Sequence, residues 1–206
     1  METSKSFSQN LYTELSAEGK KFRDLRNILY SEPNQIECLI KLNTMETDHP
    51  YLHRDCNEVY PNIFISNERA AKNKKFLKSV GVTHLLNAAE GTGIERVNTN
   101  SDYYADIEIK YLGLPLDDSE ITQICDYFKV VADFIDEGIN SGGKVLVNCA
   151  AGMSRSSTCV LAYLMIKKHM NIDDAIRQIR AHREILPNDG FLYQLIELNK
   201  TLTLNL

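Results

Sequence analysis

The sequence predicts an α/β fold in which a central, mostly parallel sheet is flanked by helices. Short apolar runs alternate with longer amphipathic segments from Cys56 onward, as in domains whose strands and helices alternate along the chain. The run Lys144–Asn148 carries three adjacent aliphatic side chains, which is typical of a strand buried on both faces. A loop of small residues follows this strand and leads into an apolar helix. Such loops lie at the carboxyl ends of strands, where α/β folds usually bind ligands.

The expected elements follow from the period of the apolar positions, which differs between strands and helices. Strands are expected at Val59–Tyr60, Ile63–Ile65, Thr83–Asn87, Ile107–Tyr111 and Lys144–Asn148. Helices are expected at Lys72–Val80, Ile121–Glu137, Ser156–His169, Ile172–His182 and Asp189–Thr201. Gly81 and Gly138 are natural stops for the first two helices, because glycine readily adopts the left-handed conformation that ends a helix.

Residues 1–50 are predicted to form a helical N-terminal extension, and residues 51–206 the main domain. Apolar side chains recur there at steps of three, four and seven, which is one helical stripe: Leu11, Leu15, Phe22, Leu25 and Leu29. Gly19 interrupts the stripe, and Ser16 is a candidate cap for a second helix that ends near Ser31. Two interpretations stay open. The helices pack on the domain that follows, or they form a docking arm or a homodimer contact.

Composition narrows the class of protein. The chain has 206 residues and a formal net charge of -5, so it lacks the basic footprint of a nucleic-acid-binding protein. No apolar run is long enough to cross a membrane, and the polar start lacks a secretory signal, so we expect a cytoplasmic protein, with the nucleus as a second location. The five cysteines form no CxxC pair, which favours free thiols over a zinc or redox site.

The segment Asn148–Ser156 carries the clearest chemical signal. Its small residues and Gly152 allow successive backbone N–H groups to turn inward and hold an anion, at the positive end of the helix that follows. Arg155 adds a planar fork that binds two phosphate oxygens. Cys149, at the start of the loop, is then placed as a thiolate for in-line attack on phosphorus. The alternative is a buried cysteine beside an ordinary helix start. The spacing of cysteine, glycine and arginine between a strand and a helix favours the phosphate site.

This loop resembles that of the cysteine-dependent protein tyrosine phosphatases, and the chain is similar to their small atypical dual-specificity members of the VHR type. Further similar segments are Cys56–Val59, Thr83–Gly91, Val97–Asn100, Tyr111–Gly113 and Pro187–Leu192. The similarity covers roughly residues 55–200 and leaves residues 1–50 unmatched.

The resemblance implies a protein phosphatase that hydrolyses phosphotyrosine, phosphoserine and phosphothreonine through a phosphocysteine intermediate. Cys149 would attack phosphorus, Arg155 would bind the equatorial oxygens, and Ser156 would donate a hydrogen bond to the departing thiolate. The general acid, counted along the similar segments, falls on Asp118. Asp117 is the alternative, and the residues alone leave both as ordinary loop carboxylates.

The same resemblance implies the remaining contacts of the substrate, which are Ala150, Ala151, Gly152, Met153, Ser154, Arg183 and Glu90. Arg183 would contact a second phosphate, or else it is a solvated arginine at a helix end. Glu90 would line the pocket wall. No metal or cofactor is expected, because the loop and its arginine stabilise the anion. The implied partners are phosphorylated proteins, with MAP kinases as a family-level expectation.

The resemblance breaks at Asn148, where the family carries histidine. Asparagine donates a hydrogen bond but carries no charge, so we expect a less ionised Cys149 thiol and a slower enzyme, with a reactive fraction lower by about ten-fold. Three functions are therefore weighed: an active dual-specificity phosphatase, a phosphoprotein-binding pseudophosphatase with weak or no turnover, and a lipid or arsenate enzyme with a similar loop. Ala150, Ala151 and Met153 argue against lipid substrates, since inositol phosphates favour basic residues there.

Overall fold

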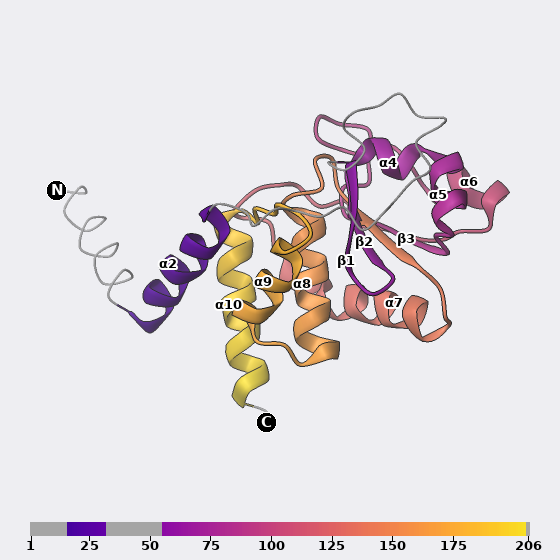
Figure 1. Cartoon of the computed structure of the whole chain (residues 1–206). Coiled ribbons are helices and arrows are strands. Elements are labelled where there is room, and N and C mark those ends of the chain that lie inside the picture. The colour runs from indigo at the N-terminus through magenta and orange to yellow at the C-terminus, as the bar shows by residue number, and fades with distance from the viewer. Residues whose placement is uncertain (1–15, 32–54, 205–206) are drawn as a thin grey trace.

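A five-stranded sheet lies at the centre of the fold, which a computed structural model describes for residues 16–31 and 55–204 (Figure 1). Its strands are β1 (Cys56–Tyr60), β2 (Ile63–Ser66), β3 (His84–Asn87), β4 (Lys110–Gly113) and β5 (Val145–Asn148). Their spatial order is β1-β2-β5-β3-β4, and among them only the pair β1 and β2 is antiparallel. The predicted α/β architecture with a mostly parallel sheet is confirmed.

Helices lie on both sides of this sheet (Figure 1). One side holds α4 (Glu68–Lys72), α5 (Lys74–Val80) and α6 (Ser101–Tyr104), and the other holds α7 (Phe128–Asn140), α8 (Arg155–Lys168), α9 (Ile172–Arg180) and α10 (Asp189–Leu204). The strands alternate accordingly, because successive side chains point to opposite faces. Leu85 and Leu146 pack in the cluster with α4 and α5, whereas Leu86 and Val147 pack in the cluster with α7 and α8.

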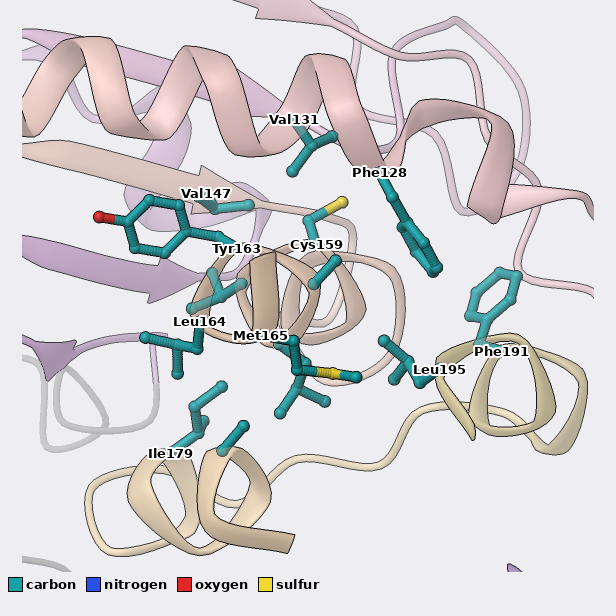
Figure 2. Close-up of a cluster of buried hydrophobic side chains, with 14 of the residues drawn as sticks. Phe128, Val131, Val147, Cys159, Tyr163, Leu164, Met165, Ile179, Phe191 and Leu195 are labelled. Atoms are coloured by element: carbon teal, nitrogen blue, oxygen red, sulfur yellow. The ribbon is translucent and has the colours of Figure 1, made fainter. Parts of the chain in front are cut away.

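Helix α8 is the centre of the larger hydrophobic cluster. All its residues from Arg155 to Met165 are buried. Figure 2 shows Cys159, Tyr163 and Leu164 of this helix among side chains of α7, α9 and α10. A helix that is apolar on most faces is expected to be enclosed in this way. The packing holds the start of α8 directly beyond the end of β5.

Two predicted boundaries shift because the backbone turns where the sequence pattern continues. The strand predicted at Ile107–Tyr111 is displaced to β4, since Ala105–Ile107 forms a short 3-10 helix, η1, and Glu108 adopts a positive φ of 54°. The helix predicted at Lys72–Val80 begins at Lys74 as α5, because Lys72 is the last residue of a separate helix, α4, which was not predicted. The side chain of Asn73 caps the second of these helices.

The helix predicted at Ile121–Glu137 also differs from the structure. Residues Ile124–Tyr127 form a second 3-10 helix, η2, and α7 continues past the predicted stop. Gly138 lies inside α7 because it packs against β5, where an added Cβ would lie 2.5 Å from Val145 Cγ2. Its role is therefore close packing between helix and sheet, whereas Gly81 does end α5 in a left-handed conformation with φ 80°.

Helix α2 (Ala17–Tyr30) packs against α9 and α10 (Figure 1). Ser16 caps it as expected, since its Oγ accepts a hydrogen bond from the Gly19 N–H at 3.0 Å. The ring of Phe22 stacks on Tyr193 of α10, with centroids 4.3 Å apart. The described part of the apolar stripe therefore packs on the helices that follow it in the chain.

The other predictions for the N-terminal extension fall outside the described residues. Leu11, Leu15 and the boundary at residue 50 fall within residues 1–15 and 32–54, which the structure does not describe. The division into two domains and the homodimer contact therefore stay predictions. Among the helices within residues 16–31 and 55–204, none combines the length and apolar content needed to cross a bilayer.

Arg180, at the end of α9, holds the end of α2. Its guanidinium donates hydrogen bonds to the backbone carbonyls of Ile28 and Leu29, and to Ser31 O at 2.7 Å. Ile28 O also accepts a hydrogen bond from Ser31 Oγ at 2.8 Å, so the arginine adds a second donor there and supplies the donors for Leu29 O and Ser31 O at the helix end. Burial lowers the pKa of Arg180 from its ordinary value.

Replacing Arg180 tests this attachment. Arg180→Met removes the donors to Leu29 O and Ser31 O, and we expect the free energy of unfolding to fall by about 1–3 kcal/mol. Hydrogen exchange of the α2 amides should also become faster. The exposed Arg177→Met on the same helix is the matched control and should change neither quantity. Equal protection of α2 in both variants would contradict the attachment.

Candidate active site

The loop at residues 149–154, called the Cys149 loop below, lies at the carboxyl edge of the sheet. Strand β5 is central, so its last residue, Asn148, lies opposite Ser66 of β2 and Asn87 of β3. Helix α8 begins directly after the loop, and the positive end of its dipole therefore points toward it. The site that the sequence predicts for an anion thus has a strand on one side and a helix N-terminus on the other.

The backbone carbonyls of the Cys149 loop from Ala150 to Ser154 are bonded to groups outside it. The pairs are Ala150 O with Glu68 N (3.0 Å), Ala151 O with Arg183 Nη2 (3.4 Å), Gly152 O with Arg183 Nε (2.8 Å), Met153 O with Leu186 N (2.9 Å) and Ser154 O with Thr158 N (2.9 Å). The carbonyl and the N–H of one trans peptide unit point in opposite directions. Outward carbonyls therefore leave the N–H groups turned toward the loop interior, and inward N–H groups of this kind form a nest that can hold an anion.

The sulfur of Cys149 lies at the base of this nest. Its Sγ accepts a hydrogen bond from the Gly152 N–H at 3.2 Å and lies 3.2 Å from Ser156 Oγ. Donors at these positions stabilise negative charge on sulfur. The residue is only 1% exposed, so its sulfur lies at the bottom of the loop and not on the protein surface.

The guanidinium of Arg155 is held by two backbone carbonyls. Its Nη1 donates to Glu95 O at 2.9 Å and to Leu116 O at 3.1 Å, which come from the loops after β3 and β4. The buried Nε forms no hydrogen bond within the described structure and lies 3.4 Å from Asp118 Oδ2. Arg155 thus keeps donor capacity that a bound oxyanion would satisfy.

The two candidate acids point in different directions. Asp118 Oδ1 accepts hydrogen bonds from Ser154 Oγ at 2.7 Å and from Asn188 Nδ2 at 2.8 Å, which places this carboxyl against the Cys149 loop. The side chain of Asp117 is 70% exposed and pairs with Arg96 instead. The geometry therefore brings Asp118 to the site and leaves Asp117 outside it.

The sequence suggests that Arg183 contacts a second phosphate or is a solvated arginine at a helix end. The position of its side chain matches neither, because its guanidinium faces the protein interior. The residue is 5% exposed, and its Nη1 donates to Asn57 Oδ1 at 2.6 Å while Nε and Nη2 bind the Cys149 loop. A solvated helix-end arginine is excluded, and in this arrangement the side chain supports the loop instead of reaching toward a second phosphate. Burial lowers its pKa, and the three acceptors offset that cost.

Glu90 lies beside β4. Its Oε1 is 3.1 Å from the hydroxyl of Tyr111, whose pKa burial raises to about 12. The structure gives Glu90 no hydrogen bond to the Cys149 loop within the described residues.

Within residues 16–31 and 55–204, no group of three or more histidine, cysteine, aspartate or glutamate side chains is placed to hold a metal ion.

Some residues that shape the site carry little signal in the sequence. Glu95 and Leu116 act through backbone carbonyls, so the identity of their side chains predicts nothing about Arg155. Asn57 carries the acceptor for Arg183, and only its place in a segment that resembles the family could have drawn attention to it. Asn148 has its own partner, since its Nδ2 donates to a buried asparagine of β3 at 3.2 Å.

Known proteins share this domain. The family model of the dual specificity phosphatase catalytic domain matches residues 63–201. Human tyrosine phosphatase-like serine/threonine/tyrosine-interacting protein is 31% identical, with a TM-score of 0.64 over 73% of this chain and 99% of that one. DUSP15 is 28% identical, with a TM-score of 0.61 over 74% and 97% of the two chains. Human DUSP28, at 23% identity and a TM-score of 0.63 over 72% and 95%, shows the fold alone.

The chain therefore belongs to the dual-specificity phosphatases of the protein tyrosine phosphatase superfamily. Within them it belongs to the small atypical members. The resemblance seen in the sequence is confirmed at this level.

Gly152 provides a test of the nest. Its φ is +72°, and an added Cβ would lie 2.6 Å from both Ser66 O and Arg183 Nη2, so Gly152→Ala should distort the loop. We expect the affinity for tungstate, measured by calorimetry, to fall at least about ten-fold, or ~1.4 kcal/mol.

Gly142→Ala is the matched control for this variant. Gly142 has a similar φ of +75° but nothing within 4 Å of its added Cβ, so this variant suffers the backbone strain without the collision. Its tungstate affinity should equal that of the wild type. Equal affinity in all three proteins would show that the nest is not where the oxyanion binds.

Proposed function

We propose that the chain hydrolyses phosphotyrosine, phosphoserine and phosphothreonine in proteins through a phosphocysteine intermediate on Cys149. The observation that supports this most strongly is the outward bonding of every carbonyl from Ala150 to Ser154 above a hydrogen-bonded sulfur. A ring of N–H donors matches the charge on the equatorial oxygens of a phosphoryl group in transfer. Arg155 adds a guanidinium with an unused donor beside the same space.

In the first step, the Cys149 thiolate attacks phosphorus, and the S–P bond forms as the P–O bond to the leaving oxygen breaks. The protonated carboxyl of Asp118 gives its proton to that oxygen, which departs as a tyrosine, serine or threonine hydroxyl. The hydrogen bonds from Ser154 and Asn188 keep this carboxyl at the loop during the transfer.

In the second step, water attacks phosphorus and the S–P bond breaks. The Asp118 carboxylate accepts the proton of the water, and the product is inorganic phosphate. The sulfur leaves as a thiolate, which the hydroxyl of Ser156 at 3.2 Å stabilises as a donor. Acid and base are then back in their starting states.

The side chains around the loop support protein substrates. Positions 150, 151 and 153 carry Ala, Ala and Met, which offer no cation for the additional phosphates of an inositol lipid. The proposal that MAP kinases are among the substrates rests on the family resemblance alone. Mono- and doubly phosphorylated peptides from kinase activation loops test this proposal. Higher kcat/KM values for these peptides than for an inositol phosphate would support it.

A second candidate is a phosphoprotein-binding pseudophosphatase. Two observations favour it: Asn148 stands where the family carries histidine, and the Cys149 sulfur is almost fully enclosed. The similar human protein is named as phosphatase-like and as interacting with serine, threonine and tyrosine. Such a module would bind phosphopeptides at the same nest without turning them over.

Hydrolysis of a chromogenic aryl phosphate separates these two functions. We expect the wild type to turn over and Cys149→Ser to lower kcat on the order of 10³-fold or more, because the nucleophile is lost. The exposed Cys125→Ser is the control and should keep the wild-type rate. If the wild type binds phosphopeptides but hydrolyses the aryl phosphate no faster than Cys149→Ser, the chain is a binding module and not an enzyme.

The general acid is tested by the leaving group. Asp118→Asn cannot donate a proton, so we expect kcat to fall about 100-fold with a poor leaving group, such as phenol, and far less with nitrophenol. Asp117→Asn is the matched control, because that neighbour pairs with Arg96 outside the site. Similar losses on both substrates in Asp118→Asn would assign the proton transfer to another residue.

A further inference from the structure

Asn87, the last residue of β3, is a fully buried amide whose orientation is fixed. Its Oδ1 accepts the N–H of Ala89 at 3.0 Å. On its other side, Nδ2 faces three acceptors: Val97 O at 2.9 Å, Thr99 Oγ1 at 3.0 Å and Tyr111 OH at 3.2 Å. Reversing the amide would set donor against donor and oxygen against oxygen, so only one orientation is compatible with these neighbours.

Asn148, the last residue of β5, takes its orientation from Asn87. Its Nδ2 donates to Asn87 Oδ1 at 3.2 Å, and the reverse orientation would bring two oxygens together. Its own Oδ1 is left buried, without a hydrogen-bond partner in the described structure. An unpaired buried oxygen destabilises the fold, so this side chain is not explained by stability alone.

The Asn87 amide holds the wall around the nucleophile. Ala89 and Val97 pack with Cys149 in one small apolar cluster. Both are bonded to Asn87 through their backbones, at 3.0 Å and 2.9 Å. Asn148 in turn is the residue directly before Cys149, and its backbone O accepts the Ala88 N–H at 2.8 Å. The two side chains therefore join the sulfur to the segment that surrounds it.

Asn87 also lies at the start of the two loops that hold Arg155, and it contacts one through its side-chain amide and the other through its backbone carbonyl. The loop after β3 returns through Val97 and carries the Glu95 carbonyl that binds the guanidinium. The loop after β4 begins at Leu114, whose N–H donates to Asn87 O at 2.8 Å, and it carries the Leu116 carbonyl. A shift of Asn87 would therefore move both of these acceptors relative to the guanidinium.

We propose that Asn148 and Asn87 form an uncharged pair of positioning residues that sets the Cys149 thiolate and the Arg155 guanidinium in register for phosphoryl transfer. This inference rests on the proposed function. The feature that matters at position 148 is a hydrogen-bond donor directed at Asn87 Oδ1, and the asparagine provides it without a charge.

The variant Asn148→Leu tests the pair, because it removes the donor and the unpaired oxygen with little change in size. We expect the free energy of unfolding to stay the same or rise, while kcat for an aryl phosphate falls about ten-fold with a smaller change in KM, since ~1.4 kcal/mol of positioning corresponds to that factor. The tungstate dissociation constant should rise. Asn148→His restores a donor and should recover activity relative to the leucine variant. The exposed Asn140→Leu is the control for the substitution itself.

The outcomes are distinct. Loss of kcat at unchanged stability, with recovery in the histidine variant, supports the pair. Wild-type kcat and tungstate affinity in Asn148→Leu overturn it, and so does a parallel loss of stability and activity in the leucine and histidine variants. If the wild type itself has no turnover, the proposed enzyme fails, and the tungstate constants of the same three proteins still decide whether the pair positions the nest.

Discussion

The site depends on one constraint, which is that the carbonyls of the Cys149 loop are turned outward and kept there. Their donors come from separate parts of the fold: the start of α4, the turn after α9, the segment before α10, and α8 itself. Helices on both sides of the sheet therefore contribute to one short loop. A carbonyl that lost its donor would be free to rotate, and the peptide N–H paired with it would then leave the nest.

Three arginines connect the Cys149 loop to the rest of the fold. Arg183 supports the Cys149 loop from behind, and Arg155 projects from its far end toward the two loops that follow β3 and β4. Arg180 lies one turn before Arg183 and binds the last carbonyls of α2. The C-terminal end of α9 thus joins the N-terminal helix to the loop that surrounds the sulfur.

The sequence predicts those parts of the fold and site that depend on neighbouring residues. The order of buried strand, small-residue loop and apolar helix is local, so the position of the Cys149 loop between β5 and α8 follows from it. Asp117 and Asp118 are adjacent and chemically alike, and residues distant in the chain distinguish them: Arg96 pairs with Asp117, whereas Ser154 and Asn188 bind Asp118. The burial of Arg183 is not predictable from the neighbouring residues either, because its acceptors lie in the Cys149 loop, some thirty residues earlier, and in β1.

The central claim is that the inward N–H groups of the Cys149 loop bind a tetrahedral oxyanion in line with the sulfur. A crystal structure with bound tungstate tests it most directly. The account predicts tungstate within hydrogen-bond distance of the loop N–H groups and the Arg155 guanidinium, directly over the sulfur, with the loop carbonyls still bonded outward. Carbonyls turned into the loop, with tungstate bound elsewhere on the surface, would contradict it.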